Sequence, residues 1–194
     1  MLATARRIRT RPRGNRGVAA IEFIIIFPIL LLLFIGAINI TQFMTVNQKV
    51  KAAAELAADL ITRNKDTIQT ADIDDYFTAV ELSLRPIDFS KVRVDVYNFY
   101  RKNNTDDTAT ERWRRSSPTG TACSSPNTAS TSPLSKLVTS QTNDVVLAVV
   151  CLPFSMPGGN ILGLGSLFNN KVIERQMLMG LRESQTLCIS AKCT

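Results

Sequence analysis

One acidic side chain stands at the start of the longest apolar run in this chain of 194 residues. Glu22 lies five residues after Gly17, and no further charge follows it until Lys49. An ionised carboxylate drawn unpaired into lipid costs roughly 2 to 4 kcal/mol. If the chain were cut after Gly17, the new α-ammonium of Val18 could pair with Glu22 of a neighbouring, offset helix and neutralise both charges. The alternative is that Glu22 stays among lipid headgroups and stabilises the helix N-terminus.

The cysteines are the second group with possible chemistry. Histidine is absent, no cysteine pair has CxxC spacing, and the spacings fit no common zinc site. An even number of cysteines beyond a membrane helix predicts two disulfides in an oxidising compartment. Three pairings are possible, and we favour Cys123 with Cys151 and Cys188 with Cys193, because the short loop of the second pair costs little entropy to close.

No residue set predicts catalysis. Without histidine a hydrolase would need a Ser-Lys pair, and Ser135 and Lys136 are adjacent residues in a polar segment, which is a poor arrangement for activating a hydroxyl. The glycine-rich residues 157–165 lack the Gly-Lys-Ser or Gly-Lys-Thr of a phosphate-binding loop, so a plain loop is expected. We therefore predict no enzyme activity, no cofactor and no metal.

A tryptophan among arginines could bind a nucleotide or sugar. Arg112, Trp113, Arg114 and Arg115 could stack on a base and grip a phosphate. The favoured interpretation is an edge strand whose arginines face water.

The positive charge is concentrated before the apolar run. The net charge is +7, and removing the six leader arginines leaves +1, so the rest of the chain has no general footprint for nucleic acid. Placed before a membrane helix, these charges predict a cytoplasmic N-terminus. They are Arg6, Arg7, Arg9, Arg11, Arg13 and Arg16.

The apolar run predicts one long helix over residues 18–62. Residues 23–40 are long enough to cross a hydrocarbon core of about 30 Å, and no small-residue cleavage site follows them, so we expect an anchor and not a signal peptide. Beyond the run, apolar residues recur at steps of three and four, which indicates an amphipathic continuation. They are Val46, Val50, Ala53 or Ala54, Ala57 and Ile61.

The remaining pattern predicts a mixed domain. A helix capped by Thr70 should bury Ile73, Phe77, Val80 and Leu84 and end before Pro86. Alternating or continuous apolar residues predict strands over 91–99, 111–115, 144–152 and 172–182, with 144–152 in the centre of the sheet. Between and after these strands we expect a turn at 103–107, a loop at 116–133, a short helix at 134–140 and a tail at 188–194.

The leader, glycine, glutamate and apolar helix resemble the type IV prepilins. Within them, residues 16–23 with Pro28 and the leucines 30–33 resemble the TadE-like family of the tight-adherence (Tad/Flp) pilus system. Arg182 and Glu183 resemble a weaker C-terminal motif of such proteins. The chain departs from many relatives at Phe23, where they carry tyrosine. The resemblance implies processing between Gly17 and Val18 and assembly through Glu22 and Phe23.

The same resemblance implies an α+β fold: a long N-terminal transmembrane helix continuing into a pilin-like periplasmic domain with an antiparallel β-sheet. The expected parts are a leader at 1–17, a transmembrane helix at 18–44 and an extracytoplasmic domain at 45–194. The protein would be a minor pseudopilin or assembly component for pilus biogenesis and adherence.

The implied location is the inner membrane, with a single pass, a cytoplasmic N-terminus and a periplasmic or extracellular domain, or association with the pilus. The implied partners are the lipid bilayer, prepilin peptidase, other pilins or pseudopilins and Tad inner-membrane components, and not nucleic acid. The alternative is an uncleaved, single-pass membrane-anchored module that binds an extracytoplasmic ligand through the Trp113 region or the loop 116–133.

Overall fold

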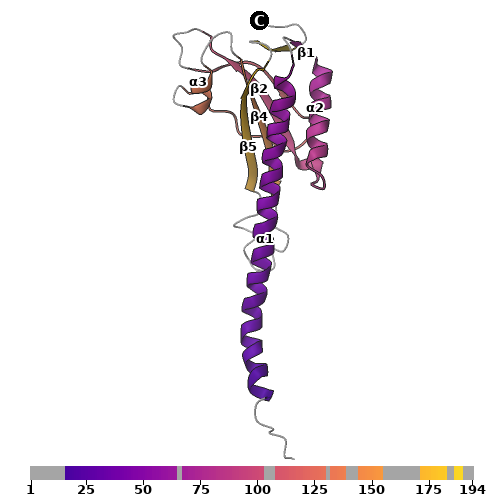
Figure 1. Ribbon diagram of the computed structural model, residues 1–194, viewed down its shortest axis with the longest axis vertical. Helices are drawn as coiled ribbons and strands as arrows, with labels where there is room; N and C mark the ends of the chain where they lie inside the picture. Colours follow the sequence, from indigo (N-terminus) through magenta and orange to yellow (C-terminus); the bar gives the residue numbers. More distant parts are fainter. Residues whose placement is uncertain are drawn as a thin grey trace, which may run out of the picture. The chain divides into compact units, whose positions relative to one another are not determined.

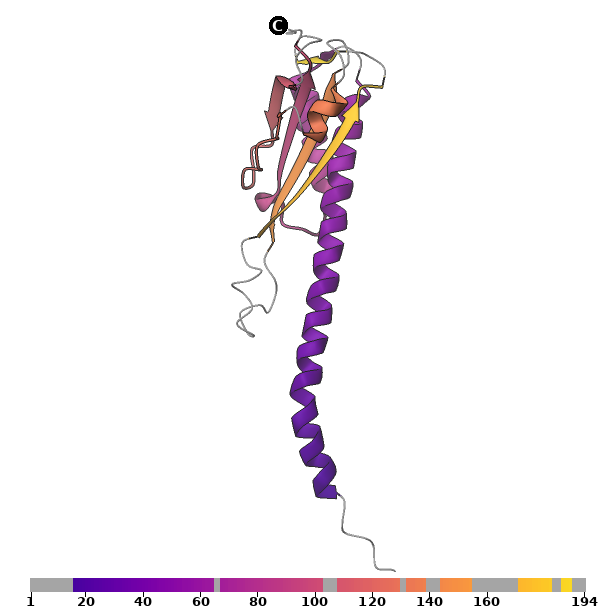
Figure 2. The same cartoon turned by 90° about the vertical axis from the view of Figure 1, so that its left-hand side faces the viewer.

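A computed structural model describes residues 16–64, 67–102, 108–129, 132–138, 144–154, 171–182 and 186–189. The predicted turn at 103–107 and the glycine-rich residues 157–165 lie outside these residues. The chain divides into two compact units, Met1–Gln42 and Phe43–Thr194. The elements of the second unit are shown from two sides in Figures 1 and 2.

The helix α1 spans Arg16–Thr62 and ends at the predicted residue. Its residues up to Gln42 belong to the first unit, and residues 43–62 belong to the second. Pro28 lies inside the helix, where a missing N–H costs a hydrogen bond. Membrane helices tolerate such breaks better than helices in water, since neighbouring groups can satisfy the freed carbonyl.

The second unit is built on a four-stranded antiparallel sheet with the order β3-β2-β4-β5. Its strands are β2 (Arg93–Tyr100), β3 (Thr110–Ser116), β4 (Val145–Phe154) and β5 (Lys171–Gly180). All four predicted strands are present, and β4 is an interior strand as predicted. The predicted α+β class with an antiparallel sheet is therefore confirmed.

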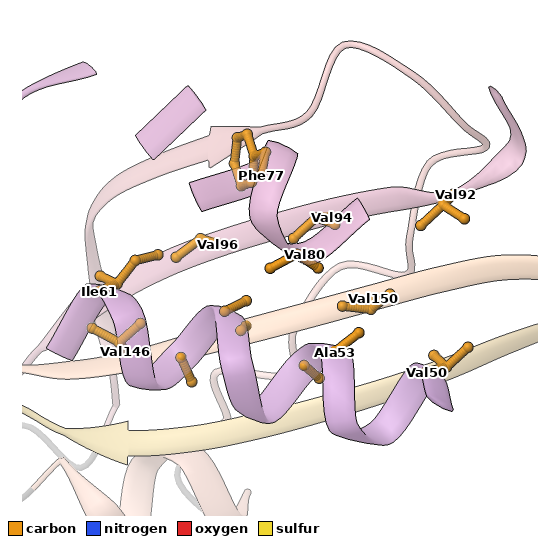
Figure 3. Close-up of a cluster of buried hydrophobic side chains, with 14 of the residues drawn as sticks. Val50, Ala53, Ile61, Phe77, Val80, Val92, Val94, Val96, Val146 and Val150 are labelled. Atoms are coloured by element: carbon orange, nitrogen blue, oxygen red, sulfur yellow. The ribbon is translucent and has the colours of Figure 1, made fainter. Parts of the chain in front are cut away.

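The first core lies between one face of this sheet and two helices (Figure 3). The second part of α1 buries the small residues Ala53, Ala54, Ala57 and Ala58 together with Ile61. The helix α2 (Thr70–Ser83) lies beside α1 (Figure 1) and, with Leu84 just after it, buries the face predicted from the sequence. Both helices thus cover the sheet with the faces that their periodicity indicates.

The start of α2 differs slightly from the prediction. Gln69, and not Thr70, is the N-cap residue. The backbone N–H of Gln69 donates to Oδ2 of Asp72 at 3.3 Å, which satisfies a donor that the helix leaves unpaired. The carboxylate three residues after the cap therefore decides where the helix begins.

The opposite face of the sheet carries a second core, which includes Tyr97, Phe99, Leu147 and Val149. Residues 117–129 cross this face without regular secondary structure, and we call them the strap. The short helix α3 (Pro133–Leu137) follows and contributes Leu134 to the core. The predicted loop is thus a cover for apolar residues and is closely bonded to the sheet.

The C-terminal part contains a pairing that the sequence did not predict. Residues beyond 187 were expected to be a plain tail. Instead, β6 (Cys188–Ile189) pairs in parallel with β1 (Thr67–Ile68), which follows α1. Each strand has two residues, which is too short for a periodic signal. A small η1 turn, Phe89–Lys91, completes the described elements.

The strap depends on one glycine. Gly120 has a φ of +83°, and a Cβ built there would lie 2.4 Å from the backbone carbon and oxygen of Val92. We expect Gly120→Ala to lower the free energy of unfolding by about 2–4 kcal/mol, because both the backbone and the contact are then strained.

Denaturation of the full chain in detergent micelles, followed by the fluorescence of its single tryptophan, measures this change. Gly180→Ala is the matched control, since nothing lies within 4 Å of a Cβ there, and it should change stability by less than about 0.5 kcal/mol. Equal stability of the two variants would contradict the assigned role of Gly120.

Candidate functional site

The apolar part of α1 is the first candidate site. Large apolar side chains from Ile21 to Met44 are exposed around the helix. This is the one helix among the described residues that is long and apolar enough to cross a membrane. So much exposed apolar surface is unfavourable in water, and lipid or other apolar helices are the environments that would cover it.

Glu22 is exposed and lies in the second turn of this helix. The first turn contains no acidic residue, and the helix macrodipole acts mainly within that turn. The interpretation of Glu22 as a partner of the helix N-terminus is therefore weakened for the uncut chain. Gly17 and Val18 lie in the first turn, so the proposed cut would bring a new N-terminus four residues from this carboxylate.

Phe23 follows Glu22 and contacts the next turn of the helix. Its ring centroid lies 5.3 Å from that of Phe27, which is the spacing of an i, i+4 pair. Arg16 begins α1, whereas the other leader arginines, Arg6, Arg7, Arg9, Arg11 and Arg13, lie outside the described residues. Phe23 therefore forms part of the apolar surface that a membrane or neighbouring helix would cover.

The structure joins Cys123 to Cys151 in a disulfide. Cys151 is a buried residue of β4, so the bond fastens the strap to an interior strand. Cys188 is also disulfide-bonded, and its predicted partner, Cys193, lies outside the described residues. In the described part of the chain, no three possible ligands gather as a metal site would require.

The arginine-rich strand β3 is an edge strand, as predicted, but its arginines do not all face water. Trp113 is 9% exposed, and its indole N–H donates to the backbone oxygen of Leu187 at 2.8 Å. Arg115 pairs with Asp74 of α2 at 3.3 Å in a pair that remains accessible to solvent, and Arg114 is exposed. This tryptophan belongs to the core and is not available for stacking on a ligand.

Arg112, the remaining arginine of β3, forms a buried ion pair with Asp144. Nε of Arg112 lies 3.1 Å from Oδ2 of Asp144, and its guanidinium lies 4.2 Å from the centre of the Tyr100 ring. The same carboxylate oxygen accepts the backbone N–H of Leu187 at 3.1 Å. Asp144 and Trp113 therefore hold Leu187 by its N–H and its carbonyl, respectively.

Burial raises the pKa of Asp144 above its ordinary value, although the N–H of Leu187 and the charge of Arg112 act in the opposite direction. The sequence gives little sign of this cluster, because Asp144 is predicted only as the first residue of the strand 144–152. Arg112 and Leu187 are distant along the chain, so only the fold brings the three residues together.

The adjacent residues Ser135 and Lys136 lie in different environments. The hydroxyl of Ser135 is buried and donates to the carbonyl of Thr128 at 2.9 Å. Lys136 is exposed on α3. The serine therefore fixes the end of the strap, and its neighbour faces solvent.

These observations define an α+β protein with one long, exposed apolar helix at its N-terminus. The model of a family described as TadE-like protein matches residues 17–59, so the predicted resemblance is confirmed for this segment. Residues 17–59 are thus similar to a TadE-like protein, and this similarity suggests a component associated with the Tad pilus. No curated protein and no solved structure matches the chain.

The buried ion pair provides a test of the second unit. Asp144→Ala should lower the free energy of unfolding by about 3–5 kcal/mol at neutral pH, because Arg112 and the N–H of Leu187 both lose their partner. Asp74→Ala removes the exposed pair with Arg115 and should cost less than about 1 kcal/mol. Chemical denaturation of the full chain in micelles compares the two variants.

The pH dependence has a defined sign. Because the folded chain raises the pKa of Asp144, the proton-linked part of its stabilisation is complete below the unfolded pKa of about 3.9 and is lost as pH rises through the folded value. The wild type should therefore lose stability relative to Asp144→Asn as the pH is raised. A relative gain would mean that Arg112 outweighs burial.

Proposed function

We propose that this chain is a minor pseudopilin or assembly component of a Tad pilus. Its leader, residues 1–17, is removed after Gly17, and residues 18–44 cross the inner membrane once. The N-terminus is cytoplasmic, and residues 45–194 form the extracytoplasmic domain. The protein acts in pilus biogenesis and adherence together with prepilin peptidase, other pilins and Tad inner-membrane components.

The observation that carries this proposal is the coincidence of three features in α1. The family match begins at Gly17, the exposed apolar surface begins a few residues later, and Glu22 is the single acid between Gly17 and Met44. A helix that only anchors a domain has no need for an acid there, and the acid raises the cost of insertion. An assembly partner with a positive charge would remove that cost.

Helix geometry makes the α-ammonium of Val18 a suitable partner. After a cut at Gly17, the new terminus lies about 6 Å from Glu22 along the helix axis, at 1.5 Å per residue. A neighbouring helix shifted along its axis by about one turn would place its own terminus beside this carboxylate. Pairing would then occur only between processed chains, so proteolysis controls assembly.

An uncleaved membrane-anchored binding module is less well supported. That alternative relied on the Trp113 region or on the loop 116–133. Trp113 is buried and bonded to Leu187, and the strap is fastened through the Cys123–Cys151 bond and the fit of Gly120 against Val92. Neither region exposes an aromatic ring on which a ligand could stack.

Processing can be tested on the membrane-extracted protein. In cells with prepilin peptidase we expect a mature N-terminus at Val18, and in cells without it a chain that begins with Met1. Intact-mass measurement and N-terminal sequencing distinguish the two forms. A chain that retains Met1 in both strains would remove processing from this proposal.

The role of Glu22 can be tested separately. Glu22→Ala should leave the protein in the membrane fraction and reduce the number of assembled pili by roughly tenfold or more, because the new α-ammonium loses its partner. Glu22→Asp keeps the charge and should restore part of the assembly. Ile25→Ala changes an exposed apolar residue of the same helix and serves as the control. Wild-type pilus numbers in Glu22→Ala would contradict the pairing.

A further inference from the structure

Two parts of the second unit meet α1 just after its apolar run. The ring of Phe43 lies 5.5 Å from the ring of Phe154, at the end of β4. Six residues further along α1, the ammonium of Lys49 donates to the backbone oxygen of Arg85 at 2.8 Å. At 1.5 Å per residue, these two contacts lie about 9 Å apart along the helix.

Cationic side chains gather at the same end of the unit. Arg175 of β5 donates from Nε to Oδ1 of Asn47 at 2.7 Å, between the two contacts above. Lys91 comes just before β2, and the register of Arg93 with Cys151 brings the start of β2 close to the end of β4. Of these cations Arg175, Arg85 and Lys91 are exposed, and Lys49 is half-buried.

Asp88 offsets the charge of Lys91, whereas Lys49 and Arg175 donate to uncharged oxygens, of the backbone of Arg85 and the side chain of Asn47. Asp88 lies 3.8 Å from Lys91, and the Ser90 hydroxyl and N–H that bond to it keep its pKa below the ordinary value. Glu174 belongs to the opposite sheet face, where it accepts the N–H of Ser124. The nearby cations Lys51 and Arg93 are paired with Glu55 and Asp95, respectively, so they add no net charge.

We propose that this end of the unit is a docking surface for the phosphates of anionic phospholipid headgroups. We call it the basal surface. Its residues are Phe43, Lys49, Arg85, Lys91 and Arg175, and the buried ring of Phe154 packs against Phe43. Clustered cations attract anionic lipid surfaces, and aromatic rings are favoured at the boundary between apolar and polar regions.

The position of this surface along the chain supports a lipid partner. Lys49 is the first charged residue after Glu22, so it ends the uncharged stretch. If residues 18–44 cross the bilayer, as the proposed function requires, residues 43–49 emerge among the headgroups. The residues that contact this stretch then lie at the same depth. They are Phe154, Arg175 and Arg85, which contact Phe43, Asn47 and Lys49, respectively.

This docking would hold the domain against the membrane before assembly. Departure of the helix from the bilayer would have to break the contacts between the basal surface and lipid phosphates. The content of anionic lipid would therefore affect how readily the chain leaves the membrane.

The test uses the full chain in nanodiscs of phosphatidylcholine alone and of phosphatidylcholine mixed with phosphatidylglycerol. Hydrogen exchange by mass spectrometry follows the segment 84–93, whose amides of Ile87 and Lys91 are hydrogen-bonded to local carbonyls. We expect exchange to be about threefold slower with phosphatidylglycerol, and the difference to vanish at high salt, where exposed charges are screened.

A matched pair of variants locates the effect. Replacing Lys49, Arg85, Lys91 and Arg175 together by glutamine should abolish the difference between the two lipids. Replacing Arg63, Lys102, Arg114 and Lys136 by glutamine removes the same charge outside the basal surface and should preserve it. The salt dependence of the wild type provides a second measurement that does not rely on a folded variant.

Equal exchange rates of segment 84–93 in the two nanodiscs would contradict lipid docking by the basal surface. Loss of the lipid-dependent difference to the same extent in both quadruple variants would also contradict it. Failure of the chain to enter nanodiscs of either composition would instead overturn the membrane-spanning function on which this inference rests. The two failures are therefore distinguishable.

Discussion

The packing of the second part of α1 on the sheet is the constraint on which the second unit depends. Ala53, Ala54, Ala57 and Ala58 are buried on the helix, and Ala148 lies in the same core on β4. Small side chains on both elements let a helix lie near a strand without leaving cavities. The same helix carries bulky, exposed apolar residues before Gln42. One continuous element therefore needs an apolar environment around its first part and a packed sheet beside its second.

The other sheet face meets a different constraint, because no long helix among the described residues covers it. The strap performs this task with little regular structure, so it needs individual fastenings in place of a repeating ladder. These are the Cys123–Cys151 bond, the close contact at Gly120 and the hydroxyl of Ser135 bonded to Thr128. Polar groups also fix the residue before β6, where Asp144 and Trp113 bind the backbone of Leu187.

The proposed function connects these constraints to assembly. A helix that moves from lipid into a bundle of similar helices exchanges one apolar environment for another, so the apolar residues themselves give little preference between the two. A charge pair between Val18 and Glu22 would supply that preference. The basal surface would act at the other end of the apolar segment, through cations that favour the membrane. The balance between them would decide when the chain leaves the lipid.

The sequence by itself determined the elements whose signal is periodic or long. The end of α1 at Thr62, the buried face of α2, the interior position of β4 and the TadE-like segment all followed from patterns within short windows. The tertiary structure alone decided the roles of Trp113, Arg112 and Asp144, because their partners lie far away along the chain. The parallel pairing of β1 with β6 was likewise outside the reach of local patterns, since two-residue strands carry no period. Local periodicity reports which face is buried, whereas the partner of each polar group depends on contacts that only folding creates.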